Sequence, residues 1–384
     1  MRILHTSDLH LGKRIEGKDR LGEQRKVLEE ICGIAEEKSA DLALICGDVY
    51  DSYIPPAEAE DLFYEFVEAL SCCGKRLVVA IAGNHDDPVR LCAASCLAQK
   101  QAIIISGGGD ERFKIPQSPD IRLLEQGKNY IKVEIGGERA TIAFLSYPSD
   151  ARLGEVADER GYSEKISGYL GEASASFSPD SVNVVMAHLF AAGAAPIGEE
   201  REIEAGGLKA CSLNVFSDKC HYVALGHIHR CQRLKDNAFY SGSILQYSAV
   251  EESSKCVLLA EAYSDGLKKV EKIPLLSGKK IITYAAEGVM PALNFLKSGV
   301  EDYVYLKIRQ DRPLLYDESR LLRSFDNVLG IELETELSQC GQERASRKGL
   351  SRRELFCEFY RHRYGGEPEP ELVNLFLEIT ESET

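Results

Sequence analysis

The sequence of 384 residues lacks any apolar run close to the roughly 18–20 residues that a membrane-spanning helix needs, so we expect no membrane contact. Its first residues lack the apolar stretch of a secretory signal, because Asp8 and His10 fall where that stretch would lie. We therefore expect a soluble protein of the cytoplasm. The twelve cysteines lack the C-x2-C spacing of thiolate zinc sites. Since disulfides need an oxidising compartment, we interpret the cysteines as small buried hydrophobic residues.

An excess of basic residues is also missing, because the formal net charge is −15. This charge disfavours broad, nonspecific binding to nucleic acid. It does not exclude a local site at which metal ions and a few basic side chains reverse the field. The contents of 44% hydrophobic and 28% charged residues are those of a globular protein. Since single hydrophobic cores stop growing at about 250–300 residues, the length predicts more than one domain.

Strand and helix patterns alternate at the start of the chain. Short apolar strands are expected at 2–6, 42–46 and 77–82, with helices between them at 21–37 and 55–70. This β-α-β-α-β order predicts a layered α/β domain. Further strands are expected at 141–145, 182–187, 222–225 and 256–259, and a helix-bearing insertion at 151–178.

The pattern restarts after about Lys272. A small α+β unit is predicted by a strand at 280–284, a helix at 291–296, a strand at 303–308 and a helix at 318–325. A basic stretch then leads to two short amphipathic helices. We therefore divide the chain into a domain at 1–272, a small domain at 273–340 and a tail at 341–384.

Polar residues follow five of the expected strands. The segments are Asp8-x-His10, Gly47-Asp48, Gly83-Asn84-His85-Asp86, His188 and Gly226-His227-x-His229. Loops at the carboxyl ends of strands form the site of an α/β sheet, so these side chains are predicted to converge. Their carboxylate, amide and imidazole groups, without cysteine, favour Mn²⁺, Fe²⁺ or Zn²⁺.

The alternative is that each residue is an ordinary turn former or satisfied polar group. Singly, each residue is explained better that way. Jointly, five of the eight histidines fall at ends of expected strands beside Asp, Asn or Gly, which chance explains poorly. The other three, His5, His221 and His362, are interpreted as structural.

The five segments resemble the motifs of the calcineurin-like metallophosphoesterases. Their flanks are similar to one branch of that family, the bacterial repair nucleases that work with an ATPase. The flanks in question are Ser7 to Gly12, Asp51 just after the Gly-Asp pair, and the turn Gly242-Ser243 ahead of Tyr247-Ser248.

The resemblance implies an α/β fold: a layered β-sandwich core flanked by helices, a small α+β capping domain and a C-terminal helical tail. It implies two divalent metal ions, preferably Mn²⁺, with Asp48 shared between them. One ion would be held by Asp8, His10, Asp48 and His229, and the other by Asp48, Asn84, His188 and His227. His85 would be the catalytic histidine. Asp86 either orients the His85 imidazole or caps a helix expected at 88–97, and both interpretations stay open.

The resemblance also implies a 3′–5′ exonuclease on duplex DNA ends and an endonuclease on single strands and hairpins, in DNA repair, recombination and replication. Two copies would pair through their nuclease domains and join two copies of a coiled-coil ATPase. A small-molecule or protein phosphoesterase is the main alternative, and a non-catalytic scaffold is the third.

Two further groups of residues are candidates for contacts. Lys13, Arg14 and Arg20 either touch the DNA backbone or belong to a solvated loop. The tail would bind the ATPase partner as helices in a groove, unless it folds back on its own domain. Its candidate contact residues are Leu355, Phe359, Leu372, Leu375, Phe376 and Ile379.

Overall fold

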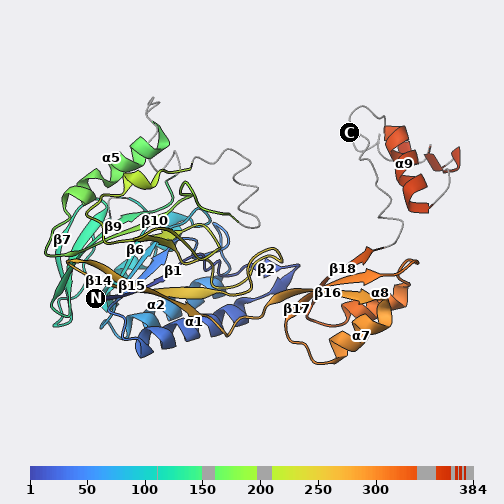
Figure 1. The fold of residues 1–384 in the computed structure, drawn as a ribbon, viewed down its shortest axis with the longest axis horizontal. Helices are drawn as coiled ribbons and strands as arrows, with labels where there is room; N and C mark the ends of the chain where they lie inside the picture. Colours follow the sequence, from blue (N-terminus) through green and yellow to red (C-terminus); the bar gives the residue numbers. More distant parts are fainter. Residues whose placement is uncertain are drawn as a thin grey trace.

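The computed structural model describes residues 1–109, 111–148, 161–196, 210–334, 352–364, 368–370, 372–373 and 376–377. Two large sheets stack face to face, and a smaller sheet lies beside them (Figure 1). The first sheet has the order β15-β14-β1-β4-β5-β6. Its strands are β1 (Arg2–Thr6), β4 (Leu42–Cys46), β5 (Leu77–Ile81), β6 (Ile103–Ser106), β14 (Cys256–Tyr263) and β15 (Gly266–Pro274).

The second large sheet has the order β12-β13-β11-β10-β9-β8-β7. Its strands are β7 (Ile121–Gln126), β8 (Tyr130–Ile135), β9 (Glu138–Leu145), β10 (Val182–His188), β11 (Tyr222–Gly226), β12 (Gln232–Lys235) and β13 (Ala238–Tyr240). The central strands β4, β5 and β10 are buried along their whole length. Parallel strands covered on both faces carry continuous apolar runs, which is why these segments show no polar alternation.

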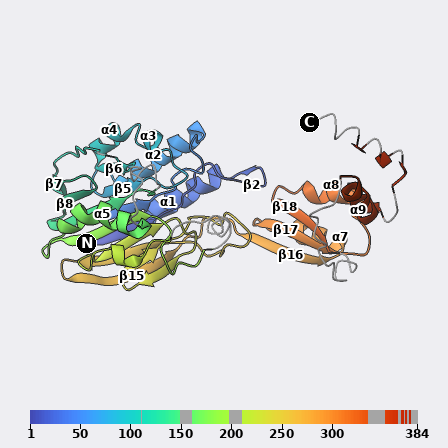
Figure 2. The ribbon, with the colours of Figure 1, turned by 90° about the horizontal axis from the view of Figure 1, so that it is seen from above.

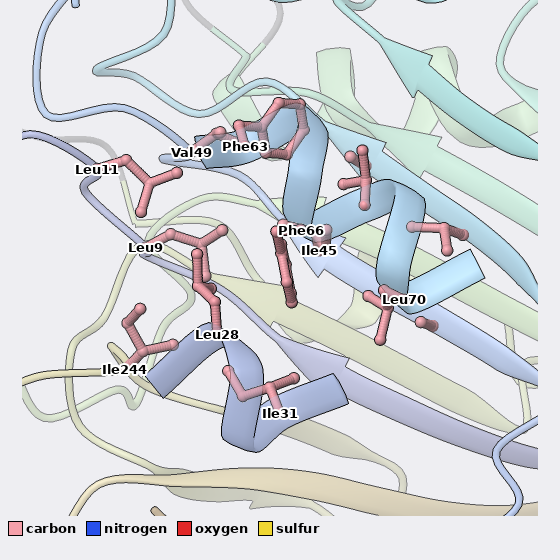
Figure 3. Close-up of a cluster of buried hydrophobic side chains, with 14 of the residues drawn as sticks. Leu9, Leu11, Leu28, Ile31, Ile45, Val49, Phe63, Phe66, Leu70 and Ile244 are labelled. Atoms are coloured by element: carbon pink, nitrogen blue, oxygen red, sulfur yellow. The ribbon is translucent and has the colours of Figure 1, made fainter. Parts of the chain in front are cut away.

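Three layers of apolar side chains hold the sandwich together. Ile3, Val79 and Val184 belong to the cluster between the two sheets. The outer face of the first sheet is covered by α1 (Leu21–Glu37) and α2 (Ala57–Ser71), and Figure 3 shows Phe66 of α2 beside Leu28 and Ile31 of α1. The outer face of the second sheet is covered by α5 (Tyr162–Ala175). The predicted layered α/β sandwich flanked by helices is confirmed.

The helix expected at 88–97 is wrong. The chain forms two short helices instead, α3 (Pro88–Leu91) and α4 (Ser95–Ala98), followed by the 3₁₀ turn η1 (Gln99–Gln101). The apolar side chains of Val89 and Leu97 are exposed to 82% and 61%. These two residues therefore give the run no buried face that would stabilise one continuous helix.

The small sheet has the order β16-β17-β18, and all its strands are parallel. It consists of β16 (Ile281–Glu287), β17 (Tyr303–Arg309) and β18 (Val328–Glu334), with α7 (Val289–Lys297) and α8 (Tyr316–Arg323) packed on it. The strand β15 of the first sheet ends at Pro274, two residues beyond the boundary expected at 272. That the small unit is a domain of its own stays a prediction.

The small sheet lies at the end of the sandwich from which a hairpin of β2 (Arg14–Ile15) and β3 (Lys18–Asp19) projects (Figure 2). Ile15 of the hairpin packs in one cluster with Ile281 and Tyr303 of the small unit. The tail contributes α9 (Arg352–Tyr364). Within the residues that the structure describes, no helix combines the length and apolar character needed to span a membrane.

The cysteines only partly follow the expectation. Cys46, Cys211, Cys220 and Cys256 are buried, but Cys73 and Cys96 are exposed. Every cysteine in the described part of the chain is a free thiol. Cys73 lies in the turn that follows α2, where its side chain has no core to enter.

Candidate metal centre

The predicted polar segments meet at one edge of the sandwich. The strands β1, β4 and β5 run parallel, as do β10 and β11, so their carboxyl ends point the same way. The loop after β1 is joined to the loop after β4, because the amides of Asp8 and His10 donate to the carbonyls of Gly47 and Asp48, each at 3.0 Å. All seven predicted metal ligands lie at this edge.

One group of donors surrounds Asn84. The Asn84 Oδ1 atom lies 3.0 Å from His188 Nε2 and 2.9 Å from His227 Nδ1. His188 Nε2 is also 3.3 Å from Asp48 Oδ2. Asp48, His188 and His227 are buried and present donor atoms within 4.8 Å of one another. We call Asp48, Asn84, His188 and His227 the second metal site.

The other group surrounds His10. The Nε2 atoms of His10 and His229 lie 3.1 Å apart, and Asp8 completes a buried cluster of donors within 4.8 Å. The same Asp48 Oδ2 atom that approaches the second metal site lies 3.8 Å from His10 Nε2. We call Asp8, His10, Asp48 and His229 the first metal site. Asp48 therefore stands between both groups, where a shared ligand has to be.

This donor set fits cations. His188 Nδ1 lies 2.8 Å from the Cys46 carbonyl oxygen, which accepts its proton. His229 Nδ1 lies 3.1 Å from Glu251 Oε1, which does the same. When Nδ1 of His188 and of His229 carries the only proton of the ring, the Nε2 atom is unprotonated. Each of these Nε2 atoms then faces other acceptor atoms of the site. Lone pairs and carboxylates packed this closely repel one another unless a cation lies between them.

The backbone is strained at the same place. Asp8 (φ +53°), His10 (φ +44°), Asp48 (φ +48°) and His227 (φ +103°) all adopt left-handed conformations. Such conformations are uncommon in non-glycine residues, cost of order 1–3 kcal/mol each and cluster at functional sites. Because four of the ligand candidates have this strained backbone, we infer that these loops form a functional site.

Burial and charge set the ionisation of the site. Burial opposes the charged form of Asp48, but His188, with His10 and His85, lowers the pKa of that carboxyl well below its usual range. Burial lowers the pKa of His227 to about 3. Burial also opposes the charged form of His188, yet Asp48 raises its pKa to about 9. A cation entering beside Asp48 would therefore displace a proton from His188.

His85 belongs to neither of these two sites, but with His10 and Asp51 it forms a third group of donor atoms within 4.8 Å of one another. Its Nδ1 is 2.8 Å from the carbonyl oxygen of Asp51, and its amide donates to Asp48 Oδ1 at 2.9 Å. The side chain is half-buried, and its ring packs edge-on against His10 with centroids 4.8 Å apart. A carbonyl oxygen can only accept, so the contact with Asp51 places a proton on the Nδ1 atom of His85.

Asp86 does not cap the helix that follows it, and its expected role in orienting His85 stays a prediction. Its carboxylate is fully buried and accepts from the amides of Val49, Tyr50 and Gly83, at 2.8 to 3.1 Å. The residue that caps α3 is Asp87, whose side chain accepts from the Arg90 amide. Through these amides Asp86 holds the loop that carries His85.

The three basic residues differ from one another. Arg20 is 1% exposed and donates to Glu23 and to the Gln246 carbonyl, so the predicted DNA contact is wrong for Arg20. Lys13 is half-buried, with Nζ 3.2 Å from Asp51 Oδ1 at the rim of the site. Arg14 is exposed and donates to the Gly17 carbonyl. Lys13 and Arg14 remain candidates for DNA contact.

The tail residues are only partly described. Phe376 stacks on Phe356 of α9 with centroids 4.2 Å apart, so this ring is engaged within the tail. Leu355, Phe359 and Leu372 are exposed, Phe359 to 60%. Leu375 and Ile379 lie outside the described residues.

The three remaining histidines can be placed as well. His5 is buried, with Nδ1 2.9 Å from Tyr222 Oη and Nε2 3.1 Å from the Leu225 carbonyl oxygen, so it links the two large sheets. His221 Nδ1 accepts from the Asn183 amide at 3.1 Å. The side chain of His362 lies outside the described part of the structure. His5 and His221 thus have the structural roles expected of them.

Sequence reasoning missed residues that hold the ligands in place. Asp51 Oδ1 lies 3.3 Å from His10 Nδ1, and Glu251 contacts His229. The only available signal for Asp51 was its position directly after the second motif. Glu251 lies in a segment that shows no motif.

The loops that carry the ligand candidates approach each other so closely that two positions, Gly83 and Gly226, have no room for a side chain. A Cβ atom on Gly83 would lie 2.0 Å from Asp48 Oδ1, and one on Gly226 would lie 1.8 Å from the Cys46 carbonyl oxygen. We expect Gly83→Ala to displace the shared carboxylate and weaken binding of both metal ions at least about tenfold, as measured by Mn²⁺ titration calorimetry.

Gly33→Ala is the matched control, because a Cβ there meets nothing within 4 Å in α1. It should bind Mn²⁺ as the parent does and stabilise the helix by roughly 0.5–1 kcal/mol. Parent-like titration of Gly83→Ala would contradict the placement of Asp48.

Known proteins resemble this chain both as a family and as individual relatives. The calcineurin-like phosphoesterase family matches residues 1–231. A solved dimetal phosphatase from Danio rerio is 13% identical over 72% of this chain and 99% of its own, with a TM-score of 0.40, a likeness too weak to add support. The chain belongs to the calcineurin-like phosphoesterases, the class that its motifs predict, and it is therefore a metal-dependent phosphoesterase.

Relatives with higher sequence identity indicate which branch of the phosphoesterase family the chain resembles. The SbcD chain of the nuclease SbcCD from Bacillus subtilis (strain 168) is 36% identical over 99% of this chain and 97% of its own length. The protein of the same name from Staphylococcus epidermidis is 30% identical over 86% of this chain and 85% of its own length. The resemblance to a nuclease branch of the family is thus confirmed.

Proposed function

We propose that this chain is the metal-dependent nuclease subunit of a DNA-processing complex with an SbcC-type ATPase. It acts as a 3′–5′ exonuclease on duplex ends and as an endonuclease on single strands and hairpins. It holds two divalent ions, Mn²⁺ in its working form. The observation that carries the proposal is the convergence of seven donor residues on two positions that share Asp48, beside His85.

Two divalent ions in these positions would supply an acidified water and withdraw charge from the phosphate oxygens. Asp48 keeps its charge in the buried site and so balances two cations at once. The carbonyl of Asp51 holds the Nδ1 proton of His85 and directs Nε2 toward the substrate. With a second proton on Nε2, the His85 imidazolium stabilises the transition state or gives that Nε2 proton to the leaving 3′ oxygen. Asp86 fixes the loop in which His85 lies.

The partner explains the acidic charge of the chain. A DNA enzyme with a net charge of −15 needs basic surface from elsewhere, because phosphate contacts dominate affinity for DNA. The ATPase provides much of that surface. The complex contains two nuclease and two ATPase chains, the nuclease domains pair as a homodimer, the small unit caps the nuclease domain, and the assembly works in the cytoplasm.

A substrate comparison tests the proposal. Purified protein is titrated with Mn²⁺ and given a labelled hairpin oligonucleotide or a nitrophenyl phosphodiester. The nuclease should cut the hairpin in a Mn²⁺-dependent manner and far faster than the small ester. Faster turnover of the small ester, with no cutting of DNA, would favour a small-molecule phosphoesterase.

The tail yields a separate prediction. Deleting 341–384 should leave the melting temperature and the Mn²⁺-dependent cleavage of single-stranded DNA unchanged, and it should abolish co-purification with the ATPase. The reason is that helices this short are marginal alone in water, and Leu355 and Phe359 expose apolar surface that a partner would cover.

Phe359→Asp should reproduce the binding defect, because burying a carboxylate in an apolar groove is costly. Tyr316→Asp on α8 is the control, since Tyr316 is also an exposed aromatic residue but lies outside the tail. A truncated protein that still binds the ATPase, or that unfolds, would refute this role of the tail.

A further inference from the structure

A buried ion pair lies behind the first metal site. We propose that Glu251 is a positioning residue that aims His229 at its metal ion, so that one of the two ions depends on Glu251 and the other does not, while Lys255 balances the buried charge of Glu251. The inference deepens the proposed function and rests on it. Neither residue belongs to a sequence motif, and both are absent from the predicted ligand set.

Glu251 contacts the imidazole directly. Its Oε1 atom lies 3.1 Å from His229 Nδ1, and its Oε2 atom accepts from the Tyr247 amide at 3.2 Å. The side chains of Glu251 and His229 are only 3% and 8% exposed. A carboxylate at Nδ1 fixes the ring orientation, keeps the proton on Nδ1 and makes Nε2 a stronger donor to a metal ion.

Lys255 forms the buried ion pair with Glu251. Its ammonium donates to three acceptors, Glu251 Oε2 at 2.7 Å, Ser243 Oγ at 2.8 Å and the His229 carbonyl oxygen at 3.1 Å. An ammonium has three protons, so this set is complete. Glu251 therefore contacts the imidazole ring of His229, whereas Lys255 contacts only the backbone of His229.

Glu251 and Lys255 should affect the melting temperature alike but metal affinity differently. This difference distinguishes a residue that positions His229 from one that only stabilises the fold. A buried ion pair contributes little net stability, but a single buried charge without its partner is strongly destabilising. Removing either charge alone should therefore lower the melting temperature, and removing both should restore much of it. Metal affinity should instead follow residue 251, because only Glu251 contacts the ring.

Three variants of the full-length protein test this difference: Glu251→Gln, Lys255→Met and the double variant. Metal-free protein is titrated with Mn²⁺ by calorimetry, and thermal melts are recorded in parallel. Glu251→Gln should lower the affinity for one ion by about 10–100-fold and leave the other unchanged, the usual effect of losing a partner behind a metal ligand. Lys255→Met should bind both ions almost as the parent does, although it melts lower.

The double variant shows whether metal affinity follows the residue at position 251 or the stability of the protein. It should melt nearer to the parent than either single variant does, yet keep the lost affinity for one ion. A spectroscopic readout supports the titration: at two equivalents of Mn²⁺, the paramagnetic resonance spectrum of the parent should be that of a coupled pair. The spectra of Glu251→Gln and of the double variant should be dominated by isolated Mn²⁺.

Glu23→Gln is the matched control. Glu23 is another carboxylate with a largely buried side chain, 2.8 Å from the buried guanidinium of Arg20, and it also accepts from the Lys279 amide. Both partners lie outside the two metal sites. This variant should melt lower but bind two ions as the parent does.

Three results would overturn the inference: parent-like affinity for both ions in Glu251→Gln, equal loss of both ions in that variant, or recovery of affinity together with stability in the double variant. Failure of the parent itself to bind two ions would refute the proposed function instead, so the two failures are distinguishable.

Discussion

Replacing His85 with alanine should abolish cleavage while both metal ions stay bound. Each of the two proposed sites has four donor residues without His85, although His85 also lies within reach of His10 and Asp51. The Nδ1 atom of His85 lies 2.8 Å from the Asp51 carbonyl oxygen, and we propose that Nε2 faces the substrate. Losing a group that acts in the transition state costs about 10²–10⁴-fold in rate. Mn²⁺-dependent cleavage of a labelled hairpin measures the rate, and titration calorimetry counts the ions.

His221→Ala is the control for His85→Ala. His221 accepts from the Asn183 amide and precedes β11, at the opposite end of that strand from the ligands His227 and His229. Its loss should therefore leave the cleavage rate and the ion count unchanged. Loss of a metal ion in His85→Ala would show that His85 is a ligand and that its catalytic role is wrong.

Replacing Asp48 with asparagine should remove both metal ions, whereas His229→Ala and His188→Ala should each remove mainly one. Asp48 Oδ2 lies 3.3 Å from His188 Nε2 and 3.8 Å from His10 Nε2, so a single oxygen serves both sites. Two cations about 3.5–4 Å apart repel strongly, and a neutral amide cannot offset that repulsion. Native mass spectrometry after equilibration with Mn²⁺ gives the ion count of each variant.

Asp87→Asn is the matched control for Asp48→Asn. Asp87 lies in the same loop as Asn84 and caps α3, a position at which asparagine caps as well as aspartate. It should retain both ions. Equal loss of both ions from all three ligand variants would contradict the division into two sites.

Most of the fold could be predicted because the central strands are simple in sequence. The helix at 21–37 coincides with α1, and the strand at 42–46 coincides with β4. Fully buried parallel strands and a one-sided helix leave strong patterns. The strands β7 and β12 left none, because each is an edge strand without a buried apolar run, and β12 has only four residues.

The ligand candidates could be predicted because they lie directly at strand ends, where topology alone brings them together. The residues that contact the ligand candidates and hold them in place could not be predicted. Glu251 lies in the loop before β14, and it reaches His229 only because the chain returns to the same sheet edge. Arg20 shows the opposite failure: a basic residue in a loop resembles a DNA contact, but its guanidinium is buried against Glu23.

The most direct test of the two-ion site is anomalous scattering from crystals of the protein grown with Mn²⁺. We expect two peaks about 3.5–4 Å apart, with Asp48 between them, His10 and His229 at one peak, and His188 and His227 at the other. A single peak, or two peaks that do not share Asp48, would contradict the two-ion site.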